Sequence, residues 1–375
     1  MFVELTKLED ILPNISLGSG ISLIDRGSYL VLDYNYIEKD LFNSAYALEC
    51  RGLKFSPEGT LLARPFHKFF NLGEKQQPED IDFSQPHLVQ EKLDGSMVHP
   101  CVLEGELVFM TRKGKTDHAD QALGIASDGV LALCAELLAA GVTPIFEFTS
   151  PENRIVVAYD RPELTLLGAR HTKSGRYLAF EQLCELSHKH RIPLVKSYGK
   201  VDDIASFSRK TRGLKDVEGC VITFADGHRL KLKADAYVLR HRALEGLKFE
   251  KTVLSWIAEG AVDDVIPLLR PDAQDALHAY VKTVENNLAK IETDLTSFHA
   301  EHKELARKDY ALRAKEKIDA RLTNVVFALL DGRDARTSLL NLLSWAAHTE
   351  GRADSIRDLT GASWVPPDLA SVESR

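Results

Sequence analysis

The sequence predicts an α+β fold, with antiparallel sheets in residues 1–250 and an all-α domain in residues 251–375. Three observations support this. Short β-rich runs recur through the first part without regular β–α alternation, which favours antiparallel sheets. Nearly every segment after residue 250 has a helical pattern. The 375 residues, 44% of them hydrophobic, are enough for two domains.

The expected strands are runs rich in β-branched, aliphatic and aromatic residues. They cover residues 29–34, 102–110, 144–148, 155–158, 164–167, 217–224 and 230–232. Turn sequences such as Pro57-Glu58-Gly59 and Ala225-Asp226-Gly227 separate them. A helix is expected over residues 120–140, because an Ala- and Leu-rich stretch ends there at Gly141, which suits a helix C-terminus.

The clearest helix of the second part covers residues 274–299. Its apolar residues recur at spacings of three and four and form one stripe, made of Leu277, Val281, Val284, Leu288, Ile291, Leu295 and Phe298. This stripe indicates a helix packed in a bundle. Further helices are expected over residues 307–330 and 337–348, and the tail after Ser363 is expected to be loosely ordered.

Composition narrows the class of protein. A net charge of −8 argues against a non-specific DNA coat, but it allows an enzyme whose basic residues gather in one groove. The five cysteines are widely spaced without a C-x-x-C pair, so they predict neither a zinc knuckle nor a disulfide framework. Acidic residues interrupt the first ten positions, and no run of about 18 apolar residues occurs, so we expect a cytoplasmic protein without a signal peptide or membrane span.

Several charged residues form a pattern that points to chemistry. Lys92-Leu93-Asp94-Gly95-Ser96 places a carboxylate and a glycine just after a lysine, as in a nucleophile turn. Glu147 lies between two phenylalanines, and Glu218 precedes a glycine in a strand-like run. Lys231 and Lys233 share one face of a strand, because side chains alternate along it. Alternating lysines usually mark a solvated face, but a solvated face does not explain the presence together of Lys92, Glu147, Glu218, Lys231 and Lys233.

The order and spacing of these elements resemble the covalent nucleotidyltransferases, a superfamily of ATP-dependent ligases and mRNA capping enzymes. The resemblance implies that Lys92 attacks the α-phosphate of a nucleotide, with Asp94 supporting it and Gly95 permitting the turn. It also implies that Glu147 faces the ribose or the metal and that Glu218 lies on the metal side. Lys231 and Lys233 match the pair of lysines that holds the α-phosphate.

The phage RNA ligase 1 family is the closer resemblance. Four elements carry it: Cys50-Arg51-Gly52, Arg64-Pro65-Phe66-His67-Lys68-Phe69-Phe70-Asn71, Thr111-Arg112-Lys113-Gly114 at the place of an S-K-G element, and Pro151-Glu152-Asn153-Arg154-Ile155-Val156. The family implies a nucleotidyltransferase (adenylation) domain over residues 1–250 and a helical RNA- or tRNA-specificity domain over residues 251–375. It adds Arg51, Lys68, Gln90, Glu91 and Lys113 to the nucleotide-binding residues, and Asp263 and Asp264 to Glu218 as metal ligands.

The resemblance implies ATP as substrate and Mg²⁺, or Mn²⁺, as cofactor. The expected partners are single-stranded RNA ends, and the family suggests cleaved tRNA as the substrate. A separate end-healing kinase or phosphatase is expected to prepare these ends. The protein is expected to be a monomer. A free lysine has a pKa of about 10.4, so a nucleophilic one needs neighbouring cations or burial. Lys113, Lys231, Lys233 and magnesium are expected to supply the positive charge.

Two other functions fit part of this pattern. A GTP-dependent capping-type nucleotidyltransferase, or a DNA ligase, usually carries an OB domain after the lysine pair, where helices are expected here. A non-catalytic protein that binds RNA ends is the alternative from another class, and it predicts no covalent nucleotide on Lys92.

Overall fold

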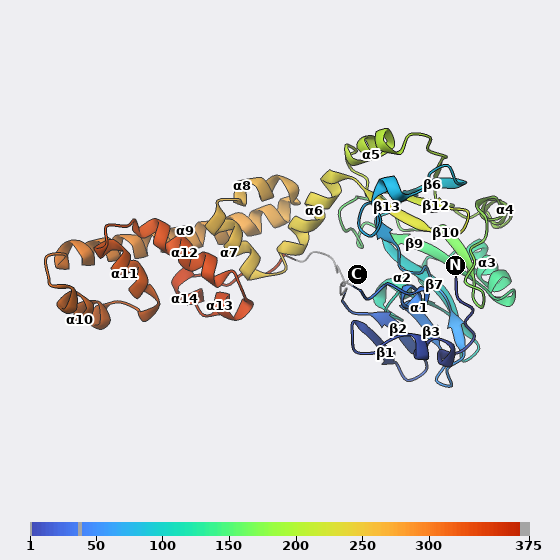
Figure 1. Cartoon of the computed structure of the whole chain (residues 1–375), viewed down its shortest axis with the longest axis horizontal. Coiled ribbons are helices and arrows are strands. Elements are labelled where there is room, and N and C mark those ends of the chain that lie inside the picture. Colours follow the sequence, from blue (N-terminus) through green and yellow to red (C-terminus); the bar gives the residue numbers. More distant parts are fainter. Residues whose placement is uncertain (1, 37–39, 368–375) are drawn as a thin grey trace. The chain divides into compact units, whose positions relative to one another are not determined.

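A computed structural model describes residues 2–36 and 40–367 of the chain. The described residues divide into two compact units, the first ending at Val238 and the second beginning at Leu239 (Figure 1). The predicted α+β class is confirmed, since antiparallel sheets form the first unit and helices the second. The boundary between the units lies within helix α6 (Asp235–Gly246), earlier than the boundary expected from the sequence after residue 250.

Among the described residues, three sheets form the first unit, and all their strand pairs except one are antiparallel. The first has the order β1 (Ile21–Asp25), β2 (Leu30–Tyr34), β3 (Arg51–Phe55) and β4 (Leu61–Ala63). The second has the order β10 (Glu163–His171), β9 (Val142–Thr149), β7 (Ser96–Leu103) and β8 (Glu106–Met110). The third has the order β11 (Ser197–Gly199), β6 (His87–Lys92), β12 (Gly219–Phe224), β13 (Arg229–Lys233) and β5 (Phe70–Asn71), in which β13 and β5 run parallel.

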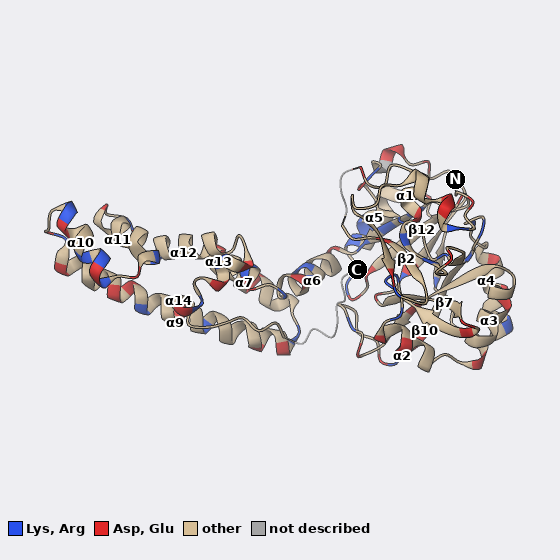
Figure 2. Cartoon of the chain, turned by 90° about the horizontal axis from the view of Figure 1, so that it is seen from below, with Lys and Arg blue, Asp and Glu red and all other residues tan. Residues whose placement is uncertain are grey.

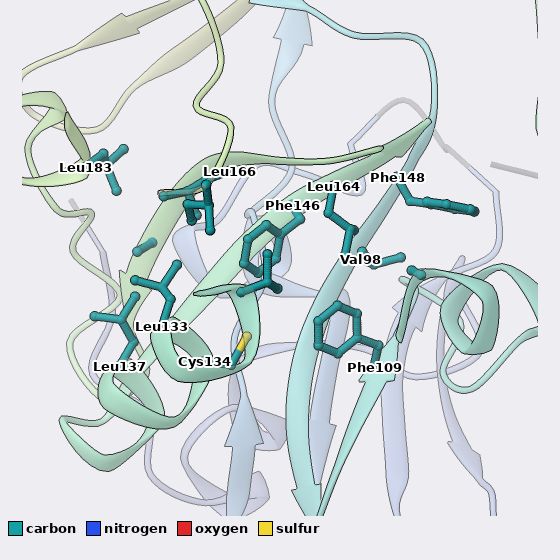
Figure 3. Close-up of a cluster of buried hydrophobic side chains, with 14 of the residues drawn as sticks. Val98, Phe109, Leu133, Cys134, Leu137, Phe146, Phe148, Leu164, Leu166 and Leu183 are labelled. Carbon is teal, nitrogen blue, oxygen red and sulfur yellow. The ribbon is translucent and has the colours of Figure 1, made fainter. Parts of the chain in front are cut away.

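Helix α3 (Asp128–Ala139) covers one face of the second sheet. Its Leu133 and Cys134 are buried in the same core as Phe146 of β9 and Leu166 of β10, and Figure 3 shows these side chains pointing toward one another. Helix α4 (Phe180–His190) packs beside α3 and adds Leu183 to this core. The other helical segments of the described first unit are α1 (Ala45–Glu49), α2 (Asp117–Gly124), α5 (Ile204–Arg212) and short 3₁₀ turns at Leu8–Asp10, Leu12–Asn14 and Pro78–Asp80.

The helix expected over residues 120–140 is two helices, α2 and α3. The break has a local cause, because the Ser127 hydroxyl accepts a hydrogen bond from the Val130 backbone N–H and starts α3 as an N-cap. Gly141 follows α3 in the left-handed region, with φ of 68°, as expected for the end of a helix. No single helix in the described part of the chain is long and apolar enough to cross a membrane, and the bent pair α2–α3 meets that test only as a pair.

Most of the expected strands are present, but residues 155–158 are not a strand. The Val156 and Val157 backbone N–H groups instead donate to the Asp94 carboxylate, at 2.8 and 2.9 Å. A loop that supplies two adjacent N–H groups to one carboxylate cannot offer them to a neighbouring strand. The apolar run in the sequence therefore marks burial rather than strand pairing, since Ile155 and Val156 are buried.

The second unit is a helical array built on one long helix, α9 (Pro271–His302), which confirms the helix expected over residues 274–299. Leu277, Val284, Leu288, Leu295 and Phe298 of the predicted stripe are buried. Helices α12 (Ala335–Ala346), α11 (Thr323–Leu330) and α14 (Arg357–Thr360) pack on α9. The other described elements are α7 (Glu250–Glu259), α8 (Val262–Val265), α10 (Arg307–Lys317), α13 (Glu350–Asp354) and 3₁₀ turns at Ile266–Leu268 and Ala320–Leu322.

A buried carboxylate fixes the end of the described chain within the second unit. Glu250 accepts hydrogen bonds from the Tyr280 hydroxyl and the Trp364 backbone N–H, at 2.8 and 3.0 Å, and pairs with Arg357 at 2.6 Å. The expectation of a loosely ordered tail after Ser363 is therefore wrong for Trp364, whose side chain is also buried. Acidic residues outnumber basic ones along α9, whereas basic residues outnumber acidic ones along α10 (Figure 2).

The first unit has a charged core of its own around Glu49. Its buried carboxylate pairs with the buried Arg64 and Arg170, at 2.7 and 2.6 Å. Burial raises the pKa of Glu49, but the two arginines outweigh it and hold that pKa below its ordinary value. This triad ties helix α1 to the second sheet and to the stretch that leads toward β5.

Replacing Glu49 with alanine is expected to destabilise the first unit by about 3–5 kcal/mol, because two buried arginines lose their counter-charge. The matched control is Glu136→Ala. Glu136 also pairs with two basic side chains, those of Lys189 and His190, but it is exposed, so its loss should cost about 0–1 kcal/mol. Urea unfolding followed by circular dichroism measures both changes. Equal losses in the two variants would show that the buried triad contributes little.

Candidate active site

The third sheet brings Lys92, Glu218 and Lys233 together. In its register Gly219 of β12 pairs with Lys92, the last residue of β6, and with Lys233, the last residue of β13. The adjoining Glu218 carboxylate bridges the two lysines, with Lys92 Nζ 2.7 Å and Lys233 Nζ 2.9 Å from its oxygens. The Glu218 side chain is fully buried, whereas the side chains of Lys92 and Lys233 are 18% and 25% exposed. Both lysine side chains are therefore partly exposed while their counter-charge is not.

The turn after Lys92 is held by Asp94. Its Oδ2 accepts the two N–H groups of Val156 and Val157, and its Oδ1 accepts a 2.7 Å hydrogen bond from the Tyr237 hydroxyl. The Asp94 backbone N–H in turn donates to the Tyr159 hydroxyl oxygen at 2.8 Å. Asp94 is buried and engaged on both oxygens, so it positions the Lys92 turn rather than facing a substrate.

Glu147 and Gly95 complete this turn. The Gly95 backbone N–H donates to Glu147 Oε1 at 3.1 Å, and Glu147 belongs to the buried strand β9. A Cβ atom on Gly95 would lie 2.3 Å from the Phe148 carbonyl oxygen, so only glycine fits here. The turn therefore packs directly on the second sheet, and this contact joins the second and third sheets at the reactive lysine.

Sequence reasoning missed Tyr159 and Tyr237. Burial, reinforced by the charges of Asp94 and Glu147, raises the pKa of Tyr159, so its hydroxyl stays protonated. The Tyr237 ring also lies 4.9 Å below Lys233 Nζ. The one sequence signal for Tyr237 is its spacing of four residues after Lys233, at the start of α6. Nothing in the sequence pairs Tyr159 with Asp94, because these residues are 65 positions apart.

Lys231 lies deeper than Lys233 on the same face of β13. Its Nζ is 4.9 Å from the Phe69 ring, and β5 runs alongside, with Lys231 paired to Asn71. Burial, followed by the positive charges of Arg51, Lys92 and Lys68, holds the pKa of Lys231 well below its ordinary value. Crowded cations without enough negative charge are typical of a phosphate-binding site.

Arg51 and Lys68 continue this set of cations. Lys68 Nζ lies 5.0, 5.4 and 5.3 Å from the rings of Tyr34, Phe42 and Phe70. Arg51 donates to the Phe66 carbonyl oxygen at 3.3 Å. The Lys68 side chain is buried among these rings, which favours a fixed ammonium over a solvated one.

The other predicted residues belong to several elements. Gln90 shares a face of β6 with Lys92 and accepts a hydrogen bond from Thr223, whereas the Glu91 side chain lies on the opposite face. Lys113 lies in the tight turn after β8. Asp263 and Asp264 belong to α8 of the second unit, whereas Lys92 and Glu218 belong to the first.

The residues around Lys92 fit a magnesium ion that is bound together with a phosphate substrate. No group of three or more His, Cys, Asp or Glu side chains that could hold a metal is found within the described ranges 2–36 and 40–367. Glu218 supplies a buried carboxylate beside Lys92 and Lys233. Mg²⁺ often uses one or two carboxylates and takes its other ligands from phosphate and water. The donor set therefore fits a metal that arrives with a phosphate substrate rather than an all-protein cage.

The Lys54 side chain fixes the backbone next to Arg51. Its fully buried amine donates to the carbonyl oxygens of Gly52 and Arg112, at 2.6 and 2.9 Å. Lys54 therefore ties β3 to the turn after β8. Burial is the main cause that lowers the pKa of Lys54, to about 7, although Asp33 nearby opposes it.

The lowered pKa of Lys54 predicts a pH-dependent stability. The unfolded chain should hold the Lys54 proton up to a pKa of about 10.4, so it binds more protons than the folded chain between about pH 7 and pH 10. The contribution of Lys54 therefore rises with pH across that window and is lost as pH falls to 7. The melting temperature of the wild type minus that of Lys54→Met should increase from pH 7 to about pH 9.5. Lys210→Met, at an exposed position, should show no such trend; a flat difference for Lys54→Met would contradict the account.

In the described first unit, mainly antiparallel sheets bring Lys92, the buried Glu218 and Lys233 together at the ends of adjacent strands, an α+β unit of the nucleotidyltransferase kind that the sequence motifs implied. The chain belongs to the RNA ligase family, whose family model matches residues 49–239. This confirms the resemblance to the phage RNA ligase 1 family that the sequence motifs carried.

Two relatives are each 32% identical to this chain. One, from Thermovibrio ammonificans, is provisionally named an RNA ligase and aligns over 252 residues, 64% of this chain and 65% of the relative. The other is RNA ligase 1 of bacteriophage TS2126, aligned over 267 residues, 67% of this chain and 66% of the relative. The match thus spans just under two thirds of either relative. A solved archaeal ATP-dependent RNA ligase superimposes with a TM-score of 0.46 at 18% identity, over 62% of this chain and 63% of that one.

Proposed function

We propose that this protein is an ATP-dependent RNA ligase that joins 5′-phosphate and 3′-hydroxyl ends of single-stranded RNA through a Lys92–AMP intermediate. One observation supports the proposal most strongly. In a member of the RNA ligase family, the amines of Lys92 and Lys233 both lie within 3 Å of the Glu218 carboxylate oxygens. Lys233 supplies a cation for the phosphate, and Glu218 is a carboxylate that could pass from the lysines to a metal ion when the substrate binds.

In the first step the uncharged Lys92 amine attacks the α-phosphorus of ATP. The new bond is N–P, and the bond that breaks is the one between the α-phosphorus and the oxygen bridging to the β-phosphate, so pyrophosphate leaves. The ion pair with Glu218 requires the ammonium form of Lys92, which has no lone pair for attack. Lys92 must therefore give its ammonium proton to solvent as Glu218 turns to another partner, and substrate binding prepares the nucleophile.

The next two steps reuse the same residues. A 5′-phosphate oxygen of RNA attacks the phosphorus of Lys92–AMP and releases the amine, and a 3′-hydroxyl then attacks the activated 5′-phosphate and releases AMP. Negative charge develops on phosphate oxygens in each step, where Lys231 and Lys233 can stabilise it. Asp94 keeps the turn fixed throughout, since its partners are backbone and tyrosine groups rather than substrate.

A bound magnesium ion would be held by Glu218, and it would neutralise phosphate charge and favour departure of the leaving group. Manganese has similar oxygen ligands and is expected to substitute. The participation of Asp263 and Asp264 stays a prediction, as does the role of the second unit in recognising RNA. Repair of cleaved tRNA, with a separate end-healing enzyme, is the biological setting that we propose.

A circularisation assay tests this function directly. Single-stranded RNA with a labelled 5′-phosphate is incubated with the protein, magnesium and ATP. The expected product is a circle whose label resists phosphatase. Labelled ATP and labelled GTP are offered in parallel, to see which of them marks the protein.

Two outcomes would favour the alternatives. Label transferred from GTP alone would indicate a capping-type enzyme. RNA binding without a covalent nucleotide and without circles would indicate a protein that only binds RNA ends. Either outcome would overturn the proposed function.

A further inference from the structure

Arg112 has an environment that the proposed reaction does not yet use. It follows β8 and occupies the place of the serine in the S-K-G element of the related family. Its guanidinium lies over the Tyr34 ring, 4.5 Å from the centroid, and its Nε is 3.5 Å from Asp33 Oδ2. Its Nη1 is buried and, among the described residues, has no hydrogen-bond partner.

An arginine held in this way has one edge left for a ligand. The aromatic ring covers one face of the guanidinium, and the carboxylate approaches from the Nε side, which leaves Nη1. A buried N–H group without a partner costs free energy that a ligand could recover. Lys54 also holds the Arg112 carbonyl oxygen at 2.9 Å, so the backbone of this arginine is fixed before any ligand arrives.

Asp33 orients the Arg112 guanidinium without filling its hydrogen-bonding capacity. The pair is loose, at 3.5 Å, and Asp33 Oδ1 is also buried without a hydrogen-bond partner in the described part of the chain. Burial raises the pKa of Asp33 above its ordinary value even though Arg112 and Lys54 oppose that shift. A tight, saturated ion pair would have the opposite effect on the carboxyl group.

Arg112 is continuous with the cations already described. Lys68 lies over the same Tyr34 ring, at 5.0 Å. Burial raises the pKa of the Tyr34 hydroxyl, but Arg51, Lys68 and Arg112 outweigh it and bring that pKa below its ordinary value. Arg51 and Lys68 also act on Lys231, so Arg112 belongs to the same group of cations. Several cations gathered in this way match a chain of phosphates rather than a single one.

We propose that Arg112 binds the outermost phosphate of the nucleoside triphosphate through Nη1 and holds the pyrophosphate as it leaves. This inference rests on the proposed function. In a displacement at phosphorus the leaving group departs in line with, and opposite to, the attacking atom. The pyrophosphate must therefore lie away from Lys92, and Arg112 shares with Lys68 the Tyr34 ring of the first sheet, whereas Lys92 ends a strand of the third. The 5′-phosphate of RNA has the same chemistry and is the other source that the test separates.

Pyrophosphate-driven reversal tests the assignment, because it needs no RNA. The wild-type enzyme is labelled with AMP, and pyrophosphate is titrated until ATP is released. Arg112→Ala should raise the half-saturating pyrophosphate concentration by roughly 10- to 100-fold, the size expected for one charge-assisted hydrogen bond. Arg112→Lys retains the charge and the pairing with Asp33 but not the planar edge, so a smaller increase is expected. Arg176→Ala, an exposed arginine of the same unit, is the control and should behave like the wild type.

The RNA arm measures the KM for 5′-phosphorylated RNA in the transfer of AMP from labelled enzyme. A larger change in this KM than in the pyrophosphate response would assign Arg112 to the RNA end and overturn the inference, as would unchanged pyrophosphate responses in both Arg112 variants. If Arg112→Ala does not fold, the response of Arg112→Lys decides. A wild-type enzyme that never acquires AMP would overturn the proposed function and this inference together, whereas wild-type adenylation with unaltered Arg112 variants would overturn this inference alone.

Discussion

Lys92→Ala is expected to abolish the transfer of label from ATP to the protein, by on the order of 10⁴-fold or more, because no other group can form the N–P bond. The fold should survive, since the Lys92 side chain is partly exposed and its ion-pair partner, Glu218, retains Lys233. Sealing of RNA that already carries AMP should persist in part, because that step does not need the amine as a nucleophile. Gel electrophoresis of the protein with labelled ATP measures the first step.

The matched control is Lys196→Ala. Lys196 is exposed and its backbone oxygen accepts a hydrogen bond from Glu91, so it belongs to the neighbourhood of β6 without reaching the site. This variant should label like the wild type. Full labelling of Lys92→Ala would show that the nucleophile lies elsewhere.

Glu218→Gln is expected to reduce both adenylation and the sealing of pre-adenylated RNA, each by on the order of 10³-fold. The amide has nearly the same shape as the carboxylate but no charge, so it can neither pair with two lysines nor bind magnesium well. The effect on both steps separates Glu218 from Lys92, whose loss affects the first step more. Rates of the two steps under single-turnover conditions measure the difference.

Glu163→Gln is the control for this substitution, because Glu163 forms an exposed ion pair with Arg161 in the same unit. It should change neither rate. A Glu218→Gln enzyme that seals pre-adenylated RNA at the wild-type rate would remove Glu218 from the metal site.

The sequence anticipated the strands that hold the reactive residues but not their register. Residues 217–224 and 230–232 were expected to be strands, and β12 and β13 lie there. Glu218 comes within 3 Å of Lys92 because Gly219 pairs with Lys92 across β6 and β12, a pairing between residues 127 positions apart in the sequence. Patterns within a window of about ten residues cannot determine such a pairing.

Two expectations were wrong because contacts between residues far apart in the sequence decide the structure there. The run at residues 155–158 has a strand-like composition, but Asp94, 62 residues earlier, takes the N–H group of Val156. Trp364 was placed in a loose tail, yet its backbone N–H binds Glu250, 114 residues away. The break at Ser127 is different, since a serine before an acidic residue is a local N-cap signal and could have been read from the sequence.

Mapping the site of AMP attachment tests the central claim most directly. Modified lysine resists trypsin, so adenylation of Lys92 should yield one peptide, residues 76–112, carrying one AMP, after digestion without acid. Mass spectrometry of protein incubated with ATP and magnesium would show this peptide, and it would be missing without ATP. AMP on Lys231, Lys113 or any other lysine, with residues 76–92 and 93–112 recovered unmodified, would contradict the account.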